Sequence, residues 1–214
     1  EDLVSQCEQV QPSLVVLYAG HNEFYGVGGV ATNATLSSWT IPLRRLRTIQ
    51  WLNGTGQSPA GGTAVGSGQL ISRMPAEFRV PEGSPLIAGA EANFRRHVTS
   101  MVAHCRARGI PLVLCNPVSN LRSQSPLASS EDRLALEKIS HQAGEPLSAT
   151  SAEKYLPLFK QAADSQPANA VLQYMLARCL EWRGEFEAAR QAYTNARDRD
   201  ECRYRAPEHY RAIL

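Results

Sequence analysis

The stretch Ser13-Leu-Val-Val-Leu-Tyr-Ala-Gly-His-Asn-Glu-Phe-Tyr-Gly26 decides the predicted fold. Its apolar run from Leu14 to Tyr18 has the length and aliphatic composition of a buried parallel strand. Ala19 and Gly20 end the run with small residues that permit close approach of the backbone. The polar residues after Gly20 are therefore expected at the carboxyl end of the strand, where open α/β sheets bind their ligands.

A helix and a second strand are predicted further along the chain. Residues 88–108 place apolar side chains at helical spacing, and Gly109 follows as a C-terminal cap. Residues 111–116 repeat the length and apolarity of the first strand. The order strand, helix, strand predicts a βαβ unit with a parallel sheet. Between the strands, residues 53–88 are rich in Gly, Pro and Ser and are expected to be a long irregular excursion.

The segment Gly20-His21-Asn22-Glu23, in its context from Pro12 to Gly26, resembles the third sequence block of the SGNH or GDSL family of serine hydrolases. The resemblance implies that the Asn22 amide donates a hydrogen bond in an oxyanion hole and that Gly20 makes the turn of that loop. His21 and Glu23 are then supporting loop residues. In the structural alternative, Asn22 caps a helix or closes an Asx-turn.

The same resemblance implies an α/β fold with a three-layer, flavodoxin-like core around a parallel sheet. It also implies a role for Asn120 and Arg122, which follow the second strand in the segment Val118-Ser-Asn-Leu-Arg122. These two residues either border a substrate cleft or anchor the loop. Anchoring is the preferred interpretation, because an arginine near a strand end often binds carbonyls or a carboxylate.

The catalytic residues of such a hydrolase are incomplete. The chain contains neither a Gly-Asp-Ser block nor an Asp-x-x-His pair, so it offers no nucleophile. We therefore expect the middle of a longer bacterial hydrolase, inactive by itself. The resemblance implies that this parent is an esterase, deacetylase or acyltransferase acting on a small-molecule or glycan ester. An extracytoplasmic or membrane-tethered location is likewise implied by the resemblance only, and localisation stays open.

The last third of the chain has a different pattern. The spacing fits a tetratricopeptide repeat, in which small residues let two helices approach, a glycine makes the turn and aromatic residues fill the space between helices. The matching residues are Leu176, Ala177, Leu180, Gly184, Phe186, Ala189, Tyr193 and Ala196. The second helix of a preceding repeat is expected around Tyr155, Phe159, Ala162 and Pro167.

These patterns predict two parts, a partial hydrolase-like α/β domain over residues 1–140 and a tetratricopeptide-like helical segment over 151–214. Fewer than three repeats do not make an independent array, so the helical segment is expected to dock on the α/β part as an insertion or appendage. The alternative function is a noncatalytic interaction module that binds a protein partner through residues 151–214.

Composition excludes several other classes. The net charge of +2, from 22 basic and 20 acidic residues, gives no field that favours nucleic acid or an anionic membrane. Five cysteines at wide spacing form no metal-ligand pattern, so neither a metal nor another cofactor is expected. No apolar stretch reaches the roughly 20 residues of a membrane span.

Overall fold

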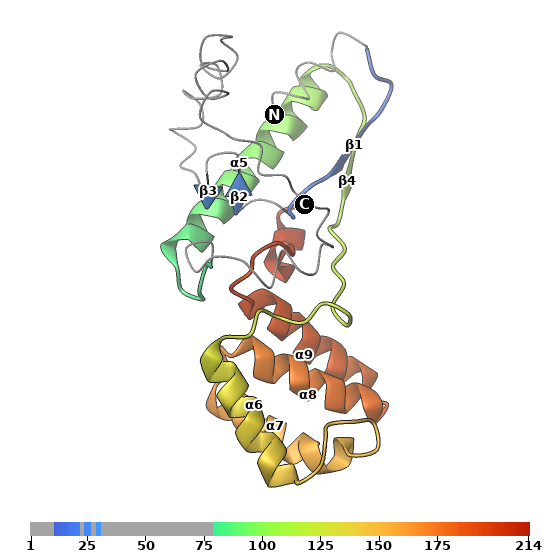
Figure 1. Cartoon of the computed structure of the whole chain (residues 1–214). Coiled ribbons are helices and arrows are strands. Elements are labelled where there is room, and N and C mark those ends of the chain that lie inside the picture. The colour runs from blue at the N-terminus through green and yellow to red at the C-terminus, as the bar shows by residue number, and fades with distance from the viewer. Residues whose placement is uncertain (1–10, 22–23, 27–28, 31–78) are drawn as a thin grey trace, which may run out of the picture.

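The computed structural model describes residues 11–21, 24–26, 29–30 and 79–214. Strands β1 (Val15–Tyr18) and β4 (Leu112–Cys115) pair in parallel, with Val15 opposite Leu112. Helix α5 (Pro85–Ala107) connects them and lies along the pair (Figure 1). A short antiparallel pair is formed by β2 (Tyr25–Gly26) and β3 (Gly29–Val30). The predicted strands, the helix between them and their parallel order are thus confirmed.

Local sequence signals set the ends of α5. Ser84 is the N-cap and its hydroxyl accepts a hydrogen bond from the Leu86 amide at 3.3 Å. Pro85 follows at the first helical position, where its missing N–H is not needed. After the helix, Gly109 has φ +66°, a conformation that a glycine adopts without steric cost. The helix therefore begins three residues before the predicted start and ends where the glycine predicts.

One face of α5 forms the core of this part of the molecule. Phe94 and Val98 are buried on the helix and pack with Leu17 of β1 and Leu114 of β4. The ring of Tyr210, far away in sequence, stacks on Phe94 with 4.7 Å between centroids. The core thus includes a residue from the C-terminal end of the chain.

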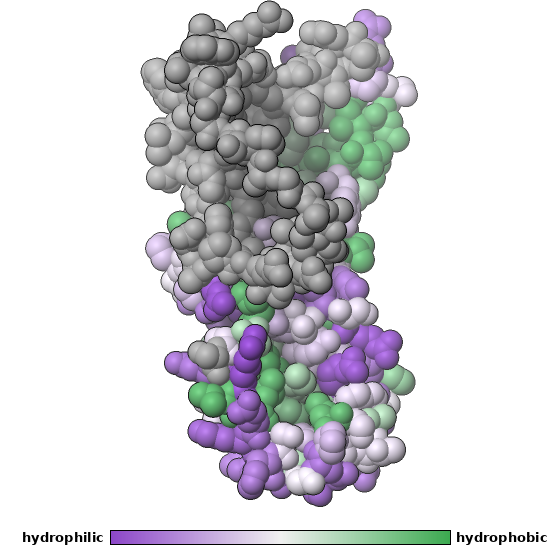
Figure 2. Space-filling model, viewed as in Figure 1, coloured by the Kyte–Doolittle hydropathy of each residue, from purple (hydrophilic) through white to green (hydrophobic). Residues whose placement is uncertain are grey.

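The predicted three-layer, flavodoxin-like core is wrong. Among the described residues the parallel sheet has two strands, and the structure is mainly helical. A three-layer core covers both faces of its sheet, but Val16 and Tyr18 are 59% and 54% exposed. Figure 2 shows apolar surface at the upper right, where Figure 1 draws β1 and β4. An unbroken apolar run does not distinguish a strand covered on both faces from one covered on one face, and here α5 covers one.

Four α-helices form the second half of the molecule (Figure 1). They are α6 (Ser130–Ala143), α7 (Ala152–Ser165), α8 (Ala170–Trp182) and α9 (Phe186–Arg199). Helix α6, absent from the sequence-based prediction, begins with a capping box in which Ser129 and Asp132 bind each other's amides. Asn169 caps α8 by accepting from the Leu172 amide.

The repeat spacing predicts most of the packing of α8 against α9. Ala177 and Ala189 are buried where the two helices approach, and Gly184 makes the turn between them with φ +80°. Tyr193 and Ala196 are also buried in this interface. The prediction that Phe186 fills the space between the helices is wrong, because this side chain lies at the start of α9 and is 68% exposed.

After α9 the chain returns to α5. A short 3-10 helix, η3 (Glu208–Ala212), places Tyr210 against Phe94, and Ala206 joins the same buried cluster. Residues 204–214 thus contain this short 3-10 helix and no α-helix. Residues of the two predicted domains share this cluster. The boundaries at 1–140 and 151–214 stay a prediction.

Candidate functional site

Gly20 lies at the carboxyl end of β1, as predicted. It is buried and has φ +114°. A Cβ on Gly20 would stand 3.5 Å from both Phe94 Cζ and Tyr210 Cδ2. The position therefore needs glycine for its backbone angle, and the turn packs against the core. The predicted residues Asn22 and Glu23 lie outside the described residues, so the oxyanion role of Asn22 is untested.

Replacing Gly20 by alanine is expected to destabilise the protein by about 1–3 kcal/mol, because a left-handed backbone is strained for a residue with a Cβ. Gly89, on α5, is the matched control: a Cβ there meets no described atom within 4 Å. Gly89→Ala is expected to stabilise by about 0.5–1 kcal/mol, since alanine favours a helix over glycine. Chemical denaturation of both variants measures the two shifts. A Gly20→Ala protein as stable as wild type would contradict the assignment.

His21 is held by a short polar chain at the end of the sheet. Its Nε2 lies 2.9 Å from the Tyr18 hydroxyl, which also accepts a hydrogen bond from the Val118 amide at 3.1 Å. The hydroxyl therefore bridges the loops that follow β1 and β4. These hydrogen bonds connect the loop that contains His21 to the loop that contains Val118.

Arg122 contacts the helical half of the molecule, whereas the Asn120 side chain bonds within its own loop. The Asn120 side chain accepts from the Ser123 amide at 2.9 Å, which forms a local turn. Arg122 Nε lies 2.5 Å from Glu181 Oε1, and the Arg122 carbonyl accepts from the Tyr174 hydroxyl at 2.6 Å. Both predicted residues thus lie in a loop bound to α8.

Three side chains form what we call the α8–α9 face, namely Tyr174, Glu181 and Tyr193. The Tyr193 hydroxyl donates to Glu181 Oε2 at 2.7 Å, and the two tyrosine rings meet edge to face at 5.4 Å. Burial is the main cause that raises the pKa of the Tyr193 phenol, and the hydrogen bond to Glu181 raises it further. The phenol is consequently a proton donor at neutral pH, and Glu181 keeps one oxygen for Arg122.

A groove of about 450 Å³ lies between α6, the end of α7 and the start of α8. Leu134, Ala135 and Ile139 of α6 supply much of its apolar lining, and Ala162 and Leu172 supply the rest. Leu134 is 56% exposed. The polar lining residues are Glu131, Asp132, Lys138, Gln166 and Asn169. Figure 2 shows apolar surface gathered between hydrophilic side chains in this helical half.

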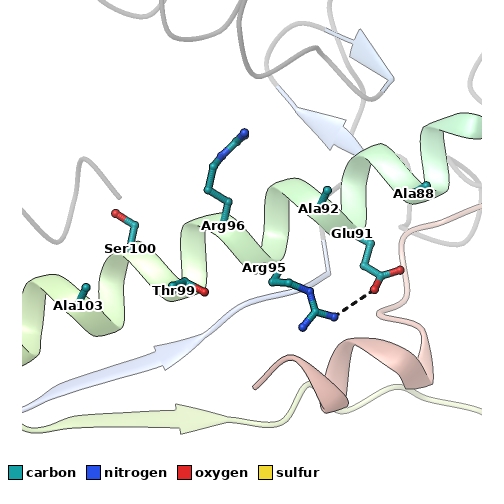
Figure 3. Close-up of a pocket in the computed structure, with 8 residues that line it drawn as sticks. All are labelled: Ala88, Glu91, Ala92, Arg95, Arg96, Thr99, Ser100 and Ala103. Atoms are coloured by element: carbon teal, nitrogen blue, oxygen red, sulfur yellow. Dashed lines mark hydrogen bonds and ion pairs between the residues drawn. The ribbon is translucent and has the colours of Figure 1, made fainter.

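A larger hollow of about 750 Å³ follows the outer face of α5 (Figure 3). Its described lining consists of small side chains together with Glu91, Arg95 and Arg96. Arg95 pairs with Glu91 at 3.3 Å, and Arg96 donates to Asn93 at 2.6 Å. These charges are satisfied along the helix itself. The described lining therefore presents no converging set of catalytic groups.

The stretch with paired helices, a glycine turn and buried alanines is also the stretch that matches a known family. Residues 142–204 match the family model of the tetratricopeptide repeat. The match spans α7, α8 and α9. No curated protein and no solved structure matches the chain.

The predicted membership of the SGNH or GDSL hydrolases is wrong. The family model that matches, over residues 142–204, is the tetratricopeptide repeat, and the described residues form a mainly helical structure with a two-stranded parallel sheet instead of the hydrolase core. The predicted assignments as a hydrolase and an esterase are therefore also wrong. The four-residue sequence Gly20-His21-Asn22-Glu23 is too short to identify a family without its surrounding fold. The tetratricopeptide repeat instead supports a protein-interaction module.

In the described part of the chain, no helix has the length and apolar character that a membrane span requires. No group of three or more His, Cys, Asp or Glu side chains in that part is arranged to hold a metal ion.

The side chains that line these surfaces were not predicted from the sequence. Tyr174 and Glu181 are seven residues apart on α8, a spacing that puts them on one face of a helix. That spacing was a usable signal. The groove was missed because Leu134 belongs to helix α6, whose capping box at Ser129 was not used in the prediction.

Proposed function

We propose that this protein is an interaction module in which helices α6 to α8 bind a segment of a partner protein. The observation that supports this proposal is the apolar groove between these helices, with Leu134 open to solvent at its edge. The match of residues 142–204 to the tetratricopeptide repeat supports the same class of function. An apolar groove between helices is a common docking place for an amphipathic peptide.

The walls of the groove indicate the chemistry of the partner. Leu134 and Ala135 offer apolar contact, which favours a bulky aliphatic or aromatic anchor on the partner. Glu131 and Asp132 lie in the first turn of α6, and Lys138 lies further along it. A basic residue beside the anchor would meet this acidic end. The proposed partner segment is therefore short, with one large apolar residue and a neighbouring Lys or Arg.

Leu134→Asp is expected to weaken binding of such a segment by at least about tenfold, because it puts a charge on the apolar contact. Peptides are first selected from a displayed random library on the wild-type chain. One enriched peptide is then synthesised, and its affinity for both chains is measured by fluorescence anisotropy. Enriched peptides are expected to carry the apolar and basic pair.

Glu137→Ala is the matched control, since Glu137 is exposed on the same helix but does not line the groove. The control is expected to bind the peptide like wild type. Equal binding by Leu134→Asp, or selection of no peptide at all, would refute the groove as the docking place. Helical circular dichroism of both variants shows that α6 is still folded.

A further inference from the structure

Residues 116–129 connect β4 to α6, and we call them the connecting segment. They form neither helix nor strand, and Leu121 and Arg122 within them contact the α8–α9 face. Leu121 packs against the buried cluster that contains Tyr174, Ala177 and Tyr193. Pro126 is buried further along the segment. The α8–α9 pair thus already holds a stretch of irregular chain.

Most polar contacts to the connecting segment are made to its backbone. The Tyr174 hydroxyl donates to the carbonyl of Arg122 at 2.6 Å. Arg205 Nη1 donates to the carbonyl of Gln124 at 2.9 Å and lies 3.4 Å from that of Asn120. Asp200 Oδ1 accepts from the Leu127 amide at 3.2 Å. Binding of main-chain groups by side chains is a means by which proteins hold extended peptides of varied sequence.

Two side chains of the connecting segment add selectivity. Leu121 enters the apolar cluster, and the Arg122 guanidinium lies 2.5 Å from Glu181, whose other oxygen is bound by Tyr193. A carboxylate fixed in this way prefers the planar guanidinium of arginine. The face therefore fits an apolar residue followed directly by an arginine.

We propose that the α8–α9 face is a peptide-binding site that the connecting segment occupies in cis. Its ligand in trans is an irregular peptide of a partner protein with a leucine-like residue followed by arginine. The Arg122 side chain is 66% exposed, so its ion pair is open to exchange with a competing arginine. This site lies away from the groove around Leu134, and either proposal can fail without the other.

The cis ligand has a kinetic and thermodynamic advantage over one in trans. A short tether gives an effective concentration in the millimolar range. A free peptide consequently competes poorly until the connecting segment is weakened. The paired replacement Leu121→Ser with Arg122→Ala removes the two side chains of the connecting segment that contact the face. It changes no residue of the face itself.

The probe is a fluorescein-labelled peptide with the sequence of residues 117–128, Pro-Val-Ser-Asn-Leu-Arg-Ser-Gln-Ser-Pro-Leu-Ala. The full chain with the paired replacement is expected to bind it at least about tenfold more tightly than wild type. Adding Tyr174→Phe and Glu181→Gln to that chain is expected to reduce the affinity about tenfold, because both contacts to the arginine residue are lost. Fluorescence anisotropy measures the affinities.

The control probe is the same peptide with Ser and Ala in place of its Leu-Arg pair. Equal binding of the two peptides, or equal binding by wild type and the paired variant, would overturn the proposal. Failure of a folded paired variant to bind would do the same.

A second measurement uses the wild-type chain, in case the paired variant does not fold. Millimolar unlabelled peptide is expected to speed hydrogen exchange in residues 116–129 while α8 stays protected. Unchanged exchange in the connecting segment would overturn the proposal.

Discussion

Phe94→Ala is expected to lower the free energy of unfolding by about 3–5 kcal/mol. The Phe94 side chain is 2% exposed and stacks on Tyr210, which is itself fully buried. Its removal leaves a cavity between α5 and the returning C-terminal segment, in addition to the lost burial of the ring. Chemical denaturation followed by circular dichroism measures the change.

Phe186→Ala is the matched control, with the same chemical change on an exposed helical position. It is expected to change the stability by no more than about 0.5 kcal/mol. The contrast tests whether the C-terminal segment completes the core of the α5 part. Similar losses for the two variants would show that Phe94 does not occupy the buried place described above.

Asp200→Asn is expected to destabilise the protein by about 3–5 kcal/mol, the usual result of breaking a buried ion pair from one side. Asp200 Oδ2 lies 2.9 Å from Arg205 Nη2, and the two side chains are nearly fully buried. Its other oxygen accepts from the amides of Leu127 and Cys202. An asparagine keeps one acceptor oxygen and leaves the Arg205 charge without its partner.

Two controls separate this loss from a general effect of charge removal. Glu145→Gln breaks the exposed pair with Lys154 and is expected to cost at most about 1 kcal/mol. The double variant Asp200→Asn with Arg205→Met is expected to be more stable than the sum of its single changes predicts, because the unpaired charge is gone. Additive losses in this cycle would contradict a direct pairing. Denaturation curves at neutral pH provide all the values.

The sequence predicted the local structure well where each element has its own signals. The spacing of apolar residues and the glycine after the helix predicted α5, and the repeat pattern predicted α8, the turn at Gly184 and α9. It did not predict α6, whose capping box at Ser129 went unused. The exposure of Phe186 was also missed, since spacing places a side chain on a face but does not show that another element covers it.

The predicted functional residues had mixed outcomes. Gly20 and His21 lie at the end of β1, whereas Arg122 contacts α8 and the Asn120 side chain closes a local turn in the same loop. The family that was assigned to the whole chain from the short motif at Gly20 was wrong. Such a motif specifies only a backbone conformation, and many folds use it. The contacts made by Arg122 depend on α8, some fifty residues further along the chain. A pattern read along the chain does not contain that pairing.

The sequence by itself determined the helical repeat, because small residues at Ala177 and Ala189 and a glycine at Gly184 allow two helices to pack closely. It also determined the parallel order of β1 and β4, because a connecting helix between two apolar strands permits little else. Only the tertiary structure decided how many faces of the sheet are covered and which surfaces are grooves. It also brought Tyr210 onto Phe94 and the connecting segment onto α8. These contacts join residues distant in the chain, and their energies depend on burial that only the folded state creates.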